Sequence, residues 1–209
     1  MKMTDFVAPD SAAARAALEV ATEYVPGALL NHSIRSWYWA VGFASLEMRQ
    51  GFDAELLYVS AVLHDVGLAV EFDNDTLSYE LAAGHVAWAL TAGAGWEASR
   101  RTRALEVIVR HNWLEVDPEQ DLEGYLLEIA TGLDISGSRS EALPENFRSE
   151  VLSAYPRLGL AAEFGSCVTD QASRKPATAA ARLIAGGLVR ALKDNPLELP
   201  GSEAPRTSK

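Results

Sequence analysis

The stretch from residue 55 to residue 67, ELLYVSAVLHDVG, is apolar at nearly every position until it reaches His64 and Asp65. A segment that is apolar on all sides predicts a helix buried in the centre of the fold. The carboxyl end of a helix carries partial negative charge, so a carboxylate such as Asp65 is unfavourable there on its own. This pair of ionisable residues at the end of a buried helix therefore requires a compensating positive charge.

Helical periodicity continues through the rest of the chain, while strand-like alternation is almost absent. Apart from the central helix at 52–67, the patterns predict helices at 10–24, 31–51, 75–93, 96–113, 122–137, 144–155 and 176–195. A chain of 209 residues is long enough for one domain with a substantial core, and no linker divides it. We therefore predict an all-α fold, a single-domain helical bundle of about seven to nine helices.

Charge and composition exclude several classes of partner. The formal net charge of −11 argues against binding a nucleic-acid backbone, because proteins that do so present a basic surface. No apolar run reaches the roughly 18 residues that a membrane span requires, and the N-terminus lacks the pattern of a signal peptide. The single cysteine, Cys167, allows no intrachain disulfide and fits a reducing cytoplasm. We expect a cytoplasmic protein with a small-molecule substrate, no nucleic acid and no membrane; the sequence leaves a homo-oligomer open.

All four histidines of the chain are predicted on or beside inward-facing helix surfaces: His32, His64, His85 and His111. Two carboxylates, Asp65 and Asp134, are predicted to face inward as well. Any one of these histidines, taken alone, is more simply explained as a satisfied core residue. Burying the whole set is costly unless its members share a partner, and a divalent cation accepts both neutral imidazole nitrogens and carboxylate oxygens. The set therefore predicts a metal site inside the bundle.

Five segments of the chain, taken in order, resemble a known family: NHSIRSWYW, ELLYVSAVLHDVGL, SYELAAGHVAWAL, ALEVIVRHNW and ATGLDISG. A histidine, then a His-Asp pair and then a distant aspartate, each on its own predicted helix, resemble the HD-domain superfamily of metal-dependent hydrolases. The five segments together are most similar to its cyanamide hydratase-like branch, over residues 25 to about 195. The resemblance implies an HD-domain-like helical fold and a metal held by four residues: His32, His64, Asp65 and Asp134.

The resemblance also divides the chain into three parts. Residues 1–24 are predicted as an N-terminal helix of the same domain, and residues 25–197 as the HD-type metal-binding helical domain. Residues 198–209, ELPGSEAPRTSK, are predicted as a disordered tail, because they are mostly polar and contain proline.

Two positions depart from patterns in the family. Many phosphohydrolase members carry a lysine shortly after the His-Asp pair, where this chain has Leu68, and this weakens a phosphate-directed function. Many members of the cyanamide hydratase-like branch lack a histidine at the position of His85. Its presence together with His111 resembles the six-residue set of two-metal members, so a second metal at His85 and His111 stays open.

The resemblance implies a divalent metal ion, with Zn²⁺ as the first expectation and Fe, Mn, Co or Ni as alternatives for histidine and aspartate ligands. Such an ion lowers the pKa of a bound water toward about 7 and so supplies a nucleophile at neutral pH. We predict a hydrolase or hydratase that hydrates or hydrolyses a small polar, cyanamide- or nitrile-like molecule. His85 and His111 are expected to move protons, with Asp65 as the third catalytic residue.

Four further residues are candidates for substrate binding: Arg35, Glu80, Arg110 and Asn112. Arg35 lies one turn after His32 and would hold an anionic group, although a surface arginine paired with a glutamate explains it equally well. Arg110 and Asn112 flank His111. Glu80 lies near the pocket only if the resemblance holds, and a solvated glutamate is at least as good an explanation.

Three alternatives remain at this point. A metal-dependent phosphohydrolase acting on a nucleotide or another phosphate monoester would use Arg35 and Arg110 for the phosphate. A two-iron oxygenase would need the pair His85 and His111. A helical binding protein that is not an enzyme would need its histidines only for structure.

Overall fold

The computed structural model describes residues 1–198, and this part of the chain folds into helices with no strand among them. Its ten α-helices are α1 (Ala12–Tyr24), α2 (Gly27–Leu46), α3 (Ala54–Leu63), α4 (Tyr79–Gly93), α5 (Ala98–Arg110), α6 (Leu122–Ser136), α7 (Glu145–Ala154), α8 (Leu160–Arg174), α9 (Ala179–Ala185) and α10 (Leu188–Lys193). Three short 3-10 helices are η1 (Met3–Asp5), η2 (Val66–Leu68) and η3 (Ser140–Ala142). The predicted all-α, single-domain bundle is confirmed.

The predicted disordered tail at 198–209 lies outside the described residues, apart from residue 198. The division of the chain into 1–24 and 25–197 stays a prediction, although α1 packs against α3 and so joins the common core. Within residues 1–198, no helix combines the length and the apolar composition needed to cross a membrane.

The described part has ten α-helices, which is more than the predicted seven to nine, because the C-terminal third is more divided than its sequence pattern indicates. No helix is predicted over Leu160–Arg174, which forms α8. The helix predicted over 176–195 is interrupted and becomes α9 and α10. Gly187 lies at this break with φ +90°, a left-handed conformation that glycine adopts without strain.

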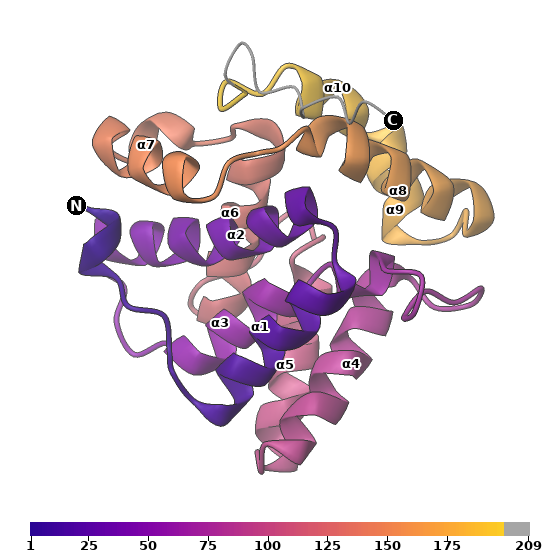
Figure 1. Cartoon of the computed structure of the whole chain (residues 1–209), viewed down its shortest axis with the longest axis horizontal. Helices are drawn as coiled ribbons and strands as arrows, with labels where there is room; N and C mark the ends of the chain where they lie inside the picture. The colour runs from indigo at the N-terminus through magenta and orange to yellow at the C-terminus, as the bar shows by residue number, and fades with distance from the viewer. Residues whose placement is uncertain (199–209) are drawn as a thin grey trace, which may run out of the picture.

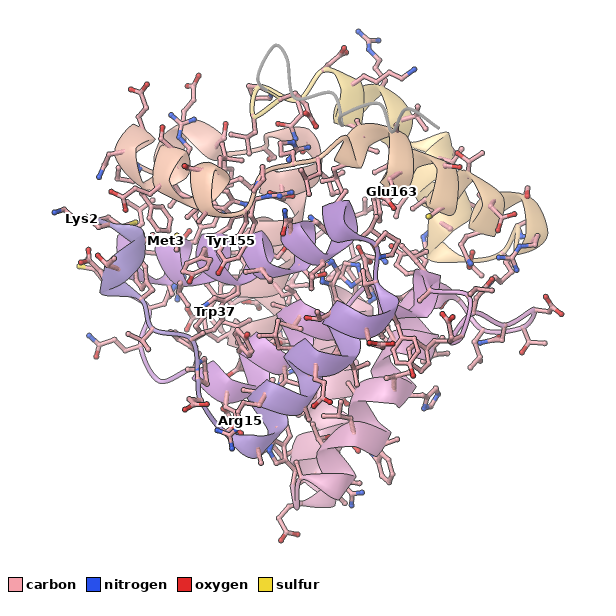
Figure 2. All side chains as sticks on the ribbon, viewed as in Figure 1. Lys2, Met3, Arg15, Trp37, Tyr155 and Glu163 are labelled. Carbon is pink, nitrogen blue, oxygen red and sulfur yellow. The ribbon has the colours of Figure 1, made fainter. Side chains whose placement is uncertain are left out.

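The long helix α2 crosses the middle of the molecule, with α3, α4 and α5 on one side of it and α7, α8 and α10 on the other (Figure 1). It packs against α3, α6 and α8, so residues of four helices meet along its length. Side chains fill the space between these helices (Figure 2). Trp37 of α2, labelled there, contacts Tyr58 of α3 edge to face, with ring centroids 5.4 Å apart.

The helix α3 is buried from Leu56 to Leu63, as its apolar sequence predicts. Asp53 caps its first turn, because its side chain accepts a hydrogen bond from the Leu56 amide at 3.0 Å. At its other end, the pair His64 and Asp65 leads into η2, which packs against the start of α4. The packing of η2 on α4 thus holds the end of α3 in the interior of the molecule.

Candidate metal centre

Three buried side chains bring potential ligand atoms together at the end of α3. His32 comes from α2, and His64 and Asp65 follow α3. The Nε2 atoms of His32 and His64 lie 3.1 Å apart. Oδ2 of Asp65 lies 3.5 Å from Nε2 of His32 and 3.2 Å from Nε2 of His64. Ligand atoms around a tetrahedral ion with bonds of about 2.0–2.1 Å are separated by about 3.3 Å. The three atoms therefore have the spacing of one face of a metal site.

The hydrogen bonds behind three histidine rings decide which nitrogen faces this point. Each ring donates its Nδ1 hydrogen to an acceptor: His32 to Asp134 Oδ2 at 2.7 Å, His64 to the Ala61 carbonyl oxygen at 2.7 Å, and His111 to the Ile108 carbonyl oxygen. Carbonyl and carboxylate oxygens only accept hydrogen bonds, so each Nδ1 carries the hydrogen. In its neutral form each ring consequently keeps a free lone pair on Nε2.

Asp65 faces these nitrogens with a carboxylate that has no hydrogen-bond donor among the described residues, although its Oδ2 lies 3.2 Å from His64 Nε2. Neither carboxylate oxygen accepts a hydrogen bond from the described residues, although the residue is only 1% exposed. His111 adds a third imidazole lone pair, with Nε2 3.9 Å from Asp65 Oδ1. Four groups that only accept hydrogen bonds thus converge in the interior, which is costly unless a cation lies among them. This donor set fits a divalent metal ion held by His32, His64 and Asp65.

The pKa shifts agree with such an ion. Burial alone would raise the pKa of Asp65, but the neighbouring histidines, His64 first, hold it at about 2. Burial lowers the pKa of His32 below its ordinary value and that of His111 to about 3. Burial also disfavours the charged form of His64, but the Asp65 carboxylate raises the pKa of this histidine above its ordinary value. Asp65 thus attracts positive charge to the point where a metal ion would replace the proton.

Asp134 lies behind His32 and outside the ligand face, which corrects the prediction that it binds the metal directly. The residue is fully buried, and donors occupy both of its carboxylate oxygens. Oδ1 accepts from Trp39 Nε1 at 2.7 Å and from Arg35 Nε at 2.8 Å. Oδ2 accepts from His32 Nδ1 and from Arg35 Nη2, each at 2.7 Å. A carboxylate in this place fixes the tautomer and orientation of a metal-binding imidazole, so Asp134 positions His32.

The two arginines predicted to contact substrate are engaged elsewhere, and this corrects both predictions. Arg35 is fully buried, and beyond its pairing with the carboxylate it donates to the carbonyl oxygens of Tyr155 and Pro156 at 3.0 and 3.2 Å. Arg110 forms an ion pair with Asp121, the residue that caps the start of α6. Both arginines therefore hold helices together.

His85 is exposed on α4, so the prediction that it faces the core beside the other histidines is wrong. The face of α4 that packs on α5 contains small residues, among them Gly84, where a Cβ would lie 2.8 Å from Leu105 Cγ. Because α4 is apolar around most of its circumference, its sequence pattern alone does not define the inward face. An exposed His85 cannot share a buried second metal with His111.

A cavity of about 160 Å³ opens beside the ligand face. His32, His64 and Asp65 contribute to its wall, and it is also lined by His111 and Asn112, both of which the sequence places among the candidate site residues. Nδ2 of Asn112 donates to the Tyr79 hydroxyl at 2.7 Å, which holds the amide in place. Its contact with substrate stays a prediction.

Glu80, the remaining candidate, is buried but does not line this cavity. Its Oε2 finds no hydrogen-bond donor among the described residues, and burial raises its pKa above the ordinary value. This excludes the solvated glutamate that the sequence also allows.

The helices α6 and α8 contribute lining residues that the sequence patterns do not single out. Glu128 and Thr131 of α6 line the cavity, six and three residues before Asp134 on the same helix. Burial raises the pKa of Glu128 to about 7. Phe164 of α8 lies with its ring centroid 5.8 Å from that of His32. Helical spacing from Asp134 is a signal that points to Thr131, three residues away. Glu128, six residues away, lies about 120° around the helix from Asp134 and has no such signal, and Phe164 belongs to a helix that the sequence does not predict.

No family model matches the chain. Two proteins of Saccharomyces cerevisiae, cyanamide hydratase DDI2 and cyanamide hydratase DDI3, are each 30% identical to it over 171 residues, which is 80% of this chain and 76% of each relative. The chain belongs to the cyanamide hydratase family. Its resemblance to the cyanamide hydratase-like branch is thereby confirmed, whereas the wider HD-domain assignment stays a prediction. In this cyanamide hydratase family member, the cavity beside His32, His64 and Asp65 is the candidate active site.

Proposed function

We propose that this protein is a metal-dependent hydratase that adds water across the carbon–nitrogen triple bond of cyanamide or a nitrile-like molecule. The observation that carries the proposal is the convergence of three imidazole lone pairs on the unpartnered Asp65 carboxylate, at the wall of a cavity. Membership of the cyanamide hydratase family supports the same reaction.

The metal would be held by His32 and His64 through Nε2 and by Asp65 through a carboxylate oxygen. When bound, the ion supplies an activated water, because it lowers the pKa of that water to about 7. Zn²⁺ accepts this donor set of two nitrogens and one oxygen, and Fe, Mn, Co and Ni accept it too. Asp134 keeps His32 in the tautomer that leaves its Nε2 available.

Adding water to a triple bond requires protons to move from oxygen to nitrogen, and residues of the cavity wall are suited to this. Glu128 has a pKa of about 7, so near neutral pH a large fraction of its carboxyl groups carries a proton that can pass to the substrate nitrogen. His111 keeps a free Nε2 that would accept a hydrogen bond from the attacking water or from the substrate. Asn112 would orient the substrate through its amide.

The cavity lining favours a neutral substrate over a phosphate ester. No lysine or arginine of the described residues lines the cavity, while Asp65 and Glu128 do. A phosphate monoester carries about two negative charges near pH 7 and is recognised mainly by arginine and lysine. Leu68 stands where many phosphohydrolase members carry a lysine, and Arg35 and Arg110 form ion pairs elsewhere. A phosphohydrolase is therefore the weaker alternative.

The other two alternatives each have one observation against them. A two-iron oxygenase needs His85 as a ligand, and this residue is exposed on α4. A helical binding protein with purely structural histidines leaves the buried Asp65 carboxylate without a partner among the described residues.

The experiment that tests the function compares His64→Ala with His85→Ala, since each removes one imidazole from the chain. Metal per chain is measured by elemental analysis of freshly purified protein, and urea formed from cyanamide is followed in the same samples. We expect His64→Ala to lose the metal and to lower kcat/KM by about a thousandfold or more. His85→Ala is expected to keep both, because its imidazole lies outside the site.

Two results contradict the proposal. One is urea formation that survives in His64→Ala. The other is wild-type protein that contains no metal, forms no urea after metal is added, and is indifferent to a chelator, which would instead favour the helical binding protein.

A further inference from the structure

The cavity beside the candidate metal site is larger than the reacting group that it would hold. Its volume is about 160 Å³. A protein cavity of about 150 Å³ lined by aliphatic and aromatic side chains is large enough to bind benzene. Cyanamide has only three non-hydrogen atoms, so it would leave most of this space unfilled.

The wall changes in character away from the metal ligands. Four helices supply apolar side chains to it: Ile135 of α6, Phe164 of α8, Leu183 of α9 and Leu188 of α10. Three of them, Ile135, Phe164 and Leu188, are buried. A surface of this kind gains free energy by removing hydrocarbon from water, whereas a second charged group would lose its hydration there.

The apolar wall continues toward the surface of the molecule. A neighbouring cavity of about 780 Å³ shares five apolar residues with the first: Trp113, Leu114, Ile135, Leu183 and Leu188. Trp113 is 51% exposed and Leu114 is fully exposed, so large apolar side chains border the opening. A substituent attached to the reacting group therefore has a largely apolar path outward, with Arg182 and Glu115 also lining the neighbouring cavity.

We propose that the preferred substrate is an organic cyanamide or nitrile that carries an uncharged apolar substituent of about the size of benzene. This inference rests on the proposed function and concerns the same site. The substituent would lie against Ile135, Phe164 and Leu188, while the carbon–nitrogen triple bond would face His64 and Asp65.

The reaction of such a substrate is balanced by one water molecule. The water oxygen forms a double bond to carbon, the two π bonds between carbon and nitrogen are lost, and both water hydrogens end on nitrogen. R–C≡N thereby becomes R–C(=O)–NH₂, with no oxidant or reductant. Among N-substituted cyanamides only the substituent on nitrogen differs from cyanamide, so their relative kcat/KM reports contacts with the apolar wall.

The first part of the test measures kcat/KM of the metal-loaded protein for cyanamide, N-butylcyanamide and N-benzylcyanamide, with the ureas quantified by chromatography. Each buried methylene group strengthens binding about fourfold. We expect both substituted compounds to exceed cyanamide at least about tenfold. An analogue with a carboxylate at the end of the butyl chain should fall below N-butylcyanamide, because no lysine or arginine of the described residues lines the first cavity, whereas Glu128 does.

The second part changes the wall and uses the ratio of kcat/KM for N-butylcyanamide to that for cyanamide as the readout. Leu188→Trp fills the space and should lower this ratio about tenfold. Leu188→Ala enlarges the cavity and should shift the substrate preference toward cyanamides with longer alkyl chains. Arg190→Trp is the matched control, since Arg190 lies on α10 with a side chain that is 89% exposed, and its ratio should equal that of the wild type. Circular dichroism checks that each variant is folded. If Leu188→Trp does not fold, the result for Leu188→Ala decides the test.

The outcomes separate the inference from the function on which it rests. A kcat/KM for cyanamide that equals or exceeds those for all substituted compounds overturns the inference and leaves the proposed function standing. A ratio that no folded Leu188 variant changes also overturns it. No hydration of any compound by metal-loaded protein overturns the proposed function and the inference together.

Discussion

At the scale of single residues, the position of the hydrogen on each imidazole decides which nitrogen is available to a metal ion. Burial would raise the pKa of Asp134, but the Arg35 guanidinium holds it well below its ordinary range. The ionised Asp134 then accepts the Nδ1 hydrogen of His32, so that Nε2 is left as an acceptor beside Asp65. The buried Asp134 carboxylate thus orients the His32 ring, while the Asp65 carboxylate faces the candidate metal position.

Glu128 gives the site a dependence on pH. Burial raises its pKa to about 7, with Arg139 opposing and Glu115 adding to the rise. Below this pH the carboxyl group keeps the proton that it would donate to substrate, and above it the proton is lost. We expect kcat/KM to fall as pH rises above about 7, and Glu128→Gln to lower kcat/KM about a hundredfold and to remove this limb of the profile. The measurement is kcat/KM between about pH 5 and pH 9 for both proteins.

The same group supplies a control that does not depend on activity. Because the pKa of Glu128 is higher in the folded chain than its ordinary 4.5, its contribution to stability is present at low pH and is lost as pH rises through about 7. Denaturant unfolding should show this loss in the wild type and not in Glu128→Gln. An identical dependence on pH in the two proteins would count against the raised pKa.

At the scale of elements, the join between α3 and α4 determines where His64 and Asp65 lie. The 3-10 helix η2 packs on the start of α4, and a Cβ at Gly67 would lie 2.1 Å from the Tyr79 carbonyl oxygen. No pair of non-bonded atoms approaches so closely, so a larger residue at this position would push the two elements apart. The glycine therefore sets the position of the candidate ligands His64 and Asp65 as well as the turn that follows them.

A pair of glycine substitutions tests this role. Gly67→Ala should lower the free energy of unfolding by about 3 kcal/mol or more and lower the metal content, because the added methyl group meets backbone. Gly93→Ala is the control at the end of α4, where the space around a Cβ is open, and it should raise stability by up to about 1 kcal/mol. Denaturant unfolding and elemental analysis measure both effects, and equal stability of the two variants would refute the role of Gly67.

At the scale of the whole molecule, the site joins segments that are far apart in the chain. His32 contacts Asp134 across 102 residues. The carbonyl oxygen of Asp134 accepts hydrogen bonds from Arg157 and Asn195, each at 2.8 Å, which connect the end of α6 to the segments that precede α8 and follow α10. A metal ion at His32 and His64 would therefore stabilise the packing of early and late helices together.

Removal of the metal should consequently lower the stability of the entire domain. At a metal concentration of about one hundred times Kd, binding stabilises the folded state by about 2.7 kcal/mol, which corresponds to about 5–10 °C in Tm for a chain of this length. Thermal unfolding with and without a chelator measures the difference. His64→Ala should show no such difference, and a wild-type Tm that the chelator leaves unchanged would contradict a bound metal.

The sequence by itself determined the fold class and predicted the three residues that the structure brings together as a candidate metal centre, His32, His64 and Asp65. Helical periodicity without strand alternation predicts the all-α bundle, and the structure agrees within residues 1–198. The buried central helix, with His64 and Asp65 at its end, follows from a local pattern in which an apolar run stops at two ionisable residues. Such patterns are local because they depend only on side-chain polarity and on spacing along one helix.

Only the tertiary structure decided which polar residues face the candidate metal site, which lie behind it and which lie outside it. Asp134 is predicted as a ligand, but in the structure it supports His32 instead, because Arg35 and Trp39 of α2 donate hydrogen bonds to its carboxylate. His85 lies outside the site because the small residues of α4 face α5 and His85 is exposed on another face of the helix. Periodicity states that a residue can face inward, but the partner that it meets depends on how closely two helices approach, and that distance is set by side chains from distant parts of the chain.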